Sequence, residues 1–204
     1  RTCGSSPAVR STSCPADPQG PTLSASGRAS NGPRDYGMQT GFLVVDQLSQ
    51  LTSRGAADLR QEGWVTAIDI GYPGYLRFIY RIELEALLRP FDIIVVQATV
   101  AQFLERKFGG VMSQIATALG CALIISDGES GVKAWVGRHE SLTDFAVPAP
   151  MCEVRDTVGA GDALMGGILA ELLESSRGRP ARSVDAHALE AACQASMERV
   201  PAVL

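Results

Sequence analysis

The stretch VRDTVGAGDALMGGILAELL, residues 154–173, places two glycines and an aspartate directly before an apolar helical pattern. Gly159, Ala160 and Gly161 carry at most a methyl side chain, so a ligand can approach the backbone closely there. The first N–H groups of a helix lack intrahelical partners and, together with the helix dipole, attract anions. The pattern predicts a helix over 159–174 that begins either with an ordinary cap or with a phosphate-binding turn.

Asp162 falls in the first turn of that expected helix. An acid is common at this position because the helix dipole favours a negative charge, and this requires no ligand. Beside a bound phosphate, a carboxylate also has a chemical use, because it can take the proton from a hydroxyl group that attacks the phosphate. The residues of this stretch alone leave both interpretations open.

Short runs rich in Val and Ile alternate with helical patterns over the rest of the chain. Buried strands are expected at 41–46, 64–70, 92–97 and 122–128, and a short antiparallel pair at 132–137 and 143–148. Helices are expected at 47–63, 76–89, 99–109, 111–120 and 185–199. This alternation is typical of an α/β fold with a mostly parallel sheet sandwiched by helices. Ligands of such sheets bind at the carboxyl ends of the strands.

The composition excludes several classes of protein. The chain is 46% hydrophobic and 20% charged, and its net charge of −4 does not favour nucleic acid as a partner. No run of about 18 apolar residues is present to span a membrane. The five cysteines and two histidines are scattered, which argues against a zinc site or a disulfide framework. We therefore expect buried free thiols and a cytoplasmic protein, with an organelle as the open alternative.

Residues 1–38 differ from the rest of the chain, because they are rich in Ser, Pro and Gly and show no apolar periodicity. Such a segment buries too little apolar surface to offset the entropy of ordering it, so we expect a disordered, low-complexity segment. A linker or upstream sequence is preferred over a transit peptide, because no amphipathic stripe is present.

Two motifs point to a known family. DTVGAGD, residues 156–162, resembles the Asp-Thr-x-Gly-Ala-Gly-Asp signature of the ribokinase-like, or PfkB-type, carbohydrate kinases. IISDGESGVKAW, residues 124–135, is similar to that family's Thr-x-Gly-x-x-Gly strand-turn-strand. The resemblance runs from about residue 42 to 199 and is strongest over 122–174. It implies that residues 40–204 are a partial kinase domain, the C-terminal two-thirds of a kinase that lacks its N-terminal part and lid.

The resemblance also implies roles for the matching residues. Asp162 would be the catalytic base, and Gly159, Ala160 and Gly161 would form the anion hole for the γ-phosphate of ATP. The remaining matches would be Ser126, Gly128 and Gly131 against the nucleotide phosphates, and Asp156 and Val158 at a monovalent cation such as K⁺. The implied reaction is transfer of this phosphate to a hydroxyl of a sugar or nucleoside. No nucleic-acid or membrane partner is expected, and a homodimer is compatible with the resemblance.

The sequence departs from the family pattern where magnesium is placed. In the family's Asn-x-x-Glu motif, Gln97 takes the Asn position and Val100 stands where Glu belongs, which puts Mg²⁺ handling in doubt. The alternative is therefore a truncated, catalytically inactive relative that only binds nucleotide or a partner. A Rossmann-type dinucleotide binder is disfavoured, because Leu164 replaces the small residue that its glycine motif requires.

Asp69 is a weaker candidate. It ends an expected strand in AIDIGYPG, on the side that faces the substrate in the family, but a loop acid without a direct role is the preferred interpretation. Tyr72 and Tyr75 follow it and are expected to pack locally rather than to stack on a ligand. His139 and His187 are expected to be surface residues.

Overall fold

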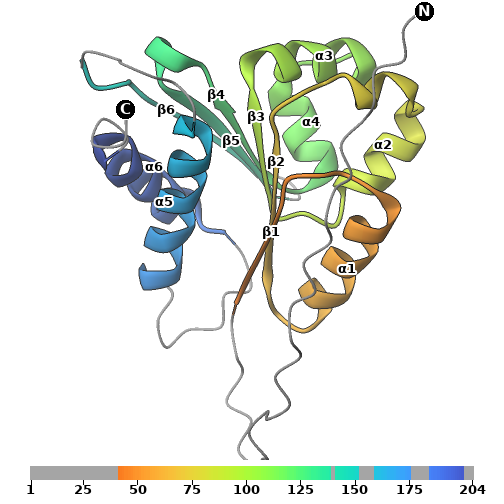
Figure 1. Ribbon diagram of the computed structural model, residues 1–204, viewed down its shortest axis with the longest axis horizontal. Coiled ribbons are helices and arrows are strands. Elements are labelled where there is room, and N and C mark those ends of the chain that lie inside the picture. Colours follow the sequence, from red (N-terminus) through yellow and green to blue (C-terminus); the bar gives the residue numbers. More distant parts are fainter. Residues whose placement is uncertain (1–40, 139–140, 152–158, 176–183, 200–204) are drawn as a thin grey trace, which may run out of the picture. The chain divides into compact units, whose positions relative to one another are not determined.

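The computed structural model describes residues 41–138, 141–151, 159–175 and 184–199, in which a six-stranded sheet carries helices on both faces (Figure 1). Its strands lie in chain order: β1 (Phe42–Val45), β2 (Val65–Ile70), β3 (Ile93–Gln97), β4 (Ala122–Ser126), β5 (Val132–Arg138) and β6 (Ser141–Val147). The first four strands are parallel, and β5 is antiparallel to both β4 and β6. The expected α/β class and the expected antiparallel pair are therefore confirmed.

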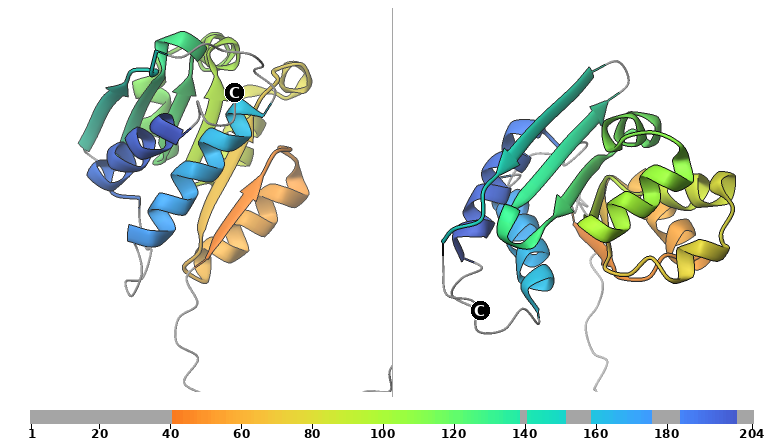
Figure 2. Two further views of the ribbon diagram at one scale, coloured as in Figure 1. Left: turned by 60° about the vertical axis from the view of Figure 1, so that its left-hand side comes forward. Right: turned by 90° about the horizontal axis from the view of Figure 1, so that it is seen from above.

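The helices divide between the two faces of the sheet, as the view from above makes clear (Figure 2). One face carries α1 (Gln50–Gln61), α2 (Arg81–Leu88), α3 (Ala98–Phe108) and α4 (Met112–Leu119). The other face carries α5 (Ala160–Ser175) and α6 (Ala186–Arg199). Two 3₁₀ turns, η1 (Tyr75–Phe78) and η2 (Gly128–Ser130), follow β2 and β4. None of the helices in the described ranges is long and apolar enough to cross a membrane.

The alternation of side chains along each strand produces two separate cores. In β2, Val65 and Ala67 pack with α5 and α6, whereas Ile68 and Ile70 pack with the helices of the opposite face. The other central strands alternate in the same way, so both faces of these strands are apolar. This is why they read in the sequence as continuous Val and Ile runs.

Sequence and structure differ over residues 76–89, where one helix was expected. The structure has η1, an extended break at Ile79 and Tyr80, and then α2. An unbroken helix would place Tyr80 on the same stripe as Leu76 and Leu84, which are both fully buried. The break lets both leucines enter the core while Tyr80 stays 81% exposed.

Other boundaries follow the glycines. Gly109 and Gly120 adopt left-handed conformations, with φ of 69° and 68°, and end α3 and α4 as separate helices.

Of the cysteines, Cys121 and Cys193 are buried free thiols as expected, and burial raises the pKa of each to about 12. Cys3, Cys14 and Cys152 lie outside the described residues.

Helix α5 is fixed by two sets of contacts. Leu164, Met165 and Ile168 are buried in the core shared with the sheet. At Gly167 the helix approaches α6 so closely that an added Cβ would lie 2.2 Å from the Ser196 Oγ. That hydroxyl donates a buried hydrogen bond of 2.9 Å to the Leu164 carbonyl oxygen, so it is not free to rotate away.

Replacing Gly167 with alanine is therefore expected to lower the free energy of unfolding by about 1–3 kcal/mol, because the two helices must move apart. Gly166→Ala is the matched control, since a Cβ there meets no described atom within 4 Å. The control is expected to raise stability by up to about 1 kcal/mol through helix propensity. Urea unfolding of both variants measures the difference, and equal stabilities would contradict the close contact.

Candidate functional site

Three polar side chains end neighbouring parallel strands on one face of the sheet. Asp69 lies near the end of β2, Gln97 ends β3, and Ser126 ends β4 directly opposite Gln97. Along their strands they alternate with residues of the α5/α6 core: Ala67, Val95 and Ile124. All three therefore belong to the face that α5 covers, at the carboxyl edge where ligands of parallel sheets bind.

The N-terminus of α5 lies at the same edge. Gly159 precedes the helix with a φ of 82°, a left-handed conformation that favours glycine. The helical hydrogen bonds begin with the Ala163 N–H, which donates to the Gly159 carbonyl oxygen at 2.8 Å. The N–H groups of Ala160, Gly161 and Asp162 precede that first bond and have no helical partner within the described residues, so they can bind an anion.

Gly161 has no such conformational reason to be glycine. It is helical and exposed, and a Cβ added to it would meet no described atom within 4 Å. Packing within the described residues therefore does not demand a glycine there. A small residue at this position leaves the adjacent backbone open to a ligand.

Asp162, the predicted base, is exposed in the first turn of α5. Its charge acts on Asp69. Asp69 was expected to be a loop acid, but it belongs to strand β2. Burial raises the pKa of the Asp69 carboxyl above its usual 3.8, and the charges of Asp162 and then Asp46 raise it further. Asp46 directly follows β1 and was not among the predicted site residues. The sequence signal that could have identified it is an acid directly after an apolar strand, in FLVVD.

The turn over residues 126–131 is explained by its own backbone. Gly128 and Gly131 have φ of 46° and 86°, and the Gly131 N–H donates to the Gly128 carbonyl oxygen at 3.1 Å. A Cβ on Gly131 would lie 2.2 Å from the Val147 carbonyl oxygen. The Ser126 hydroxyl is 3.5 Å from the Val96 carbonyl oxygen. Ser126, Gly128 and Gly131, which are predicted to contact the nucleotide phosphates, thus lie at the carboxyl edge of the sheet. The backbone of the turn is sufficient to explain both glycines.

The described residues at the magnesium position of the family motif do not fit a resident Mg²⁺ ion. Val100, at the position where the family has Glu, is apolar and fully buried in the first turn of α3. Gln97 is exposed but carries no charge. Within the described ranges no group of three or more His, Cys, Asp or Glu side chains is arranged to hold a metal.

Several other predicted residues lie outside the described ranges. These are Asp156 and Val158, predicted at a monovalent cation, together with His139 and residues 1–38. Of the remaining candidates, His187 is exposed as expected, and Tyr72 is 68% exposed beside Gly74.

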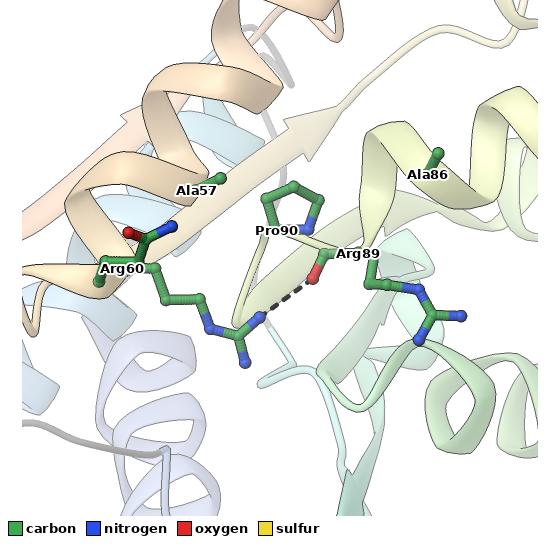
Figure 3. Close-up of a pocket in the computed structure, with 6 residues that line it drawn as sticks. Ala57, Arg60, Ala86, Arg89 and Pro90 are labelled. Carbon is green, nitrogen blue, oxygen red and sulfur yellow. Dashed lines mark hydrogen bonds between the residues drawn. The ribbon is translucent and has the colours of Figure 1, made fainter.

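A hollow of about 330 Å³ lies away from this edge (Figure 3). It is lined by Ala57, Arg60, Gln61, Ala86, Arg89 and Pro90, at the ends of α1 and α2 that lead into the amino ends of β2 and β3. The Arg60 guanidinium donates to the Arg89 carbonyl oxygen at 3.0 Å and pairs with Asp92 at 3.0 Å. This hollow is therefore at the opposite end of the strands from Asp162.

The sequence of the chain matches a known protein family. Residues 83–200 match the pfkB family carbohydrate kinases, which is more than half of the chain. The chain belongs to this family. No curated protein matches the sequence.

Solved structures with the same fold include kinases of nucleosides and sugars. Aminoimidazole riboside kinase from Salmonella enterica, complexed with aminoimidazole riboside and an ATP analogue, gives a TM-score of 0.59 at 22% identity over 81% of this chain and 56% of that one. Burkholderia thailandensis nucleoside kinase in complex with inosine gives a TM-score of 0.57 at 23% identity, over 78% of this chain and 48% of that one. Fructokinase with bound ATP from Xylella fastidiosa gives a TM-score of 0.56 at 16% identity, over 74% of this chain and 49% of that one. The chain thus spans about half the length of these proteins.

The raised pKa of Asp69 predicts how its replacement affects stability. A folded-state pKa above the unfolded value means that the folded chain holds this proton more tightly. The wild type therefore loses stability as pH rises through that pKa, whereas Asp69→Asn does not. We expect the variant to be more stable than the wild type at pH 7.5, with a smaller difference at pH 4. Urea unfolding at both pH values tests this, and a larger advantage at pH 4 would contradict it.

Proposed function

We propose that this chain carries the phosphoryl-transfer side of an ATP-dependent kinase that acts on a hydroxyl group of a sugar or nucleoside. The observation that carries the proposal is the first turn of α5, where an open glycine and an acid stand together at the carboxyl edge of the sheet. Family membership supports the same reading. The nucleoside and fructose kinases of the same fold support the acceptor class.

In the proposed reaction, the oxygen of the acceptor hydroxyl attacks the γ-phosphorus of ATP. The hydroxyl proton passes to the Asp162 carboxylate, a new P–O bond forms, and the bond to the β-phosphate oxygen breaks to release ADP. The N–H groups of Ala160, Gly161 and Asp162 stabilise the negative charge on the transferred group. Ser126 and the following turn lie at the same edge and hold the other phosphates.

Mg²⁺ and a monovalent cation, which the family resemblance implies, are given no role in this step. Within the described ranges no group of three or more His, Cys, Asp or Glu side chains is arranged to hold Mg²⁺, and no residue is assigned to that ion. Asp156 and Val158 remain the prediction for a monovalent cation. A partner subunit remains a prediction as well.

A second function is favoured by one observation. Because Val100 is fully buried where the family places Glu, the chain fits a relative that binds nucleotide without transferring phosphate. ATP binding is common to both functions, whereas transfer distinguishes them.

The glycines of α5 provide a matched test of nucleotide binding. ATP is expected to raise the melting temperature of the chain, and Gly161→Ala to weaken ATP binding at least about tenfold, since a methyl group intrudes on the anion. Gly166→Ala makes the same change in the same helix, about one and a half turns away, and should leave binding unchanged. Thermal shift and calorimetric titration of the three proteins measure the effect.

The result that would contradict this placement is equal ATP binding by Gly161→Ala and Gly166→Ala. Absence of any ATP effect on the wild type would overturn the proposed function as a whole.

Asp162→Asn tests the base. Amide replaces carboxylate at nearly constant shape, so ATP binding should persist, while phosphoryl transfer to a panel of sugars and nucleosides should fall by about 10²–10⁴-fold. Radiolabelled ATP in the wild type and the variant measures this. Equal transfer by both proteins would remove Asp162 from the role of base, and ATP binding without transfer by the wild type would favour the second function.

A further inference from the structure

We propose that the outer face of α2 binds a second copy of this chain, with a two-fold axis at Ile82. Each copy carries protruding apolar side chains at the start of α2 and a hollow at the end of the same helix. In an antiparallel pair, the protruding side chains of one copy enter the hollow of the other. The proposal does not depend on nucleotide binding, because α2 covers the face of the sheet opposite to α5 and α6 (Figure 2).

The protruding side chains are those of Phe78, Tyr80 and Ile82, and we call them the knob. They are 86%, 81% and 83% exposed. The extended break before α2 produces this arrangement, because Ile79 packs against the core while its two neighbours face outward. Single apolar side chains are common on protein surfaces, whereas three large ones within residues 78–82 indicate an interaction surface.

The hollow lies at the other end of α2 (Figure 3). Its apolar lining comes from Ala57, Ala86 and Pro90, and two arginines complete it. At about 330 Å³ it has room for an aromatic ring. Apolar walls beside guanidinium groups are surroundings that suit aromatic side chains at interfaces.

The knob and the hollow lie on one face of the helix. Ala86 follows Ile82 by four residues, which places both on the same side of α2. Along the helix axis they are about 6 Å apart. A two-fold axis at Ile82 makes the two α2 helices antiparallel, so Ala86 of one copy faces the aromatic side chains that precede the partner's helix. The surface therefore complements itself, which is why a second copy is the occupant.

The charges beside Ile82 are also self-complementary. Arg81 and Glu83 are exposed and lie on opposite flanks of Ile82, because successive helical residues are about 100° apart. A two-fold axis at Ile82 exchanges the flanks and reverses the helix direction. Arg81 of one copy thus stands beside the partner's Glu83, and the reverse pair forms on the other flank. Flanking pairs of this kind set the orientation of paired helices.

Neither charge is used up within the chain. The Arg81 guanidinium lies over the Phe108 ring, 5.9 Å from its centroid, a contact that leaves its charge uncompensated. Glu83 forms no ion pair with any residue that the structure describes. Both are therefore available to a second copy.

Sedimentation equilibrium of the full chain, from micromolar to submillimolar concentration, tests the pairing. We expect the mass to rise from the 21.6 kDa of one chain toward twice that value. Tyr80→Ser and Ile82→Ser, which remove part of the knob, are each expected to weaken dimerisation at least about tenfold. Ala86→Leu should weaken it as well, because it narrows the hollow. Leu51→Ser is the matched control, since it removes an 81% exposed side chain outside the knob.

Charge reversal tests the position of the axis. Arg81→Glu and Glu83→Arg each place like charges together twice in the dimer, so each should weaken dimerisation about tenfold. The double variant restores opposite charges on both flanks and is expected to recover dimerisation to within about threefold of the wild type. Thermal unfolding of each variant checks that the chain stays folded.

A chain that stays monomeric over the whole series would overturn the pairing. A dimer that Tyr80→Ser leaves unchanged, or single charge reversals that the double variant does not repair, would overturn this interface. ATP binding by the same proteins should be equal throughout, so failure of the interface is distinguishable from failure of the proposed function.

Discussion

The burial of α5 against the sheet fixes where its first turn stands. Leu164, Met165 and Ile168 enter the core, and the close approach of Gly167 to Ser196 sets the distance between α5 and α6. These contacts along the middle of the helix hold its first turn at the carboxyl edge of the sheet. Gly161 and Asp162 are thereby exposed in a fixed place, which is what preorganised binding of an anion requires.

That same edge carries an electrostatic cost. Asp69 is partly buried and the charges of Asp162 and Asp46 act on it, which opposes its ionisation. Stability alone would favour an amide or an apolar residue at the end of β2. Residues that cost stability in this way gather at functional sites, and this one belongs to the face that α5 covers.

Much of the fold follows from the local pattern of the sequence. Val and Ile runs predict the strands, and left-handed glycines end α3 and α4 as expected. The break at Ile79 and Tyr80 was not predictable, because it depends on burying Leu76 and Leu84 in one core. Asp162 was found through its motif. Asp69 was also named from the sequence, as an acid at the end of an expected strand, but its place on the face that α5 covers depends on the tertiary packing. The alternation of Val65, Ala67 and Asp69 was the signal for it, but only the tertiary packing gives that alternation a direction.

The central claim is that nucleotide phosphates bind at the start of α5. The most direct measurement is a backbone amide NMR titration of the chain with ATP. We expect the largest shift changes at Ala160, Gly161 and Asp162, with further changes over residues 126–131. Changes concentrated instead around Arg60 and Arg89, at the opposite end of the strands, would contradict it.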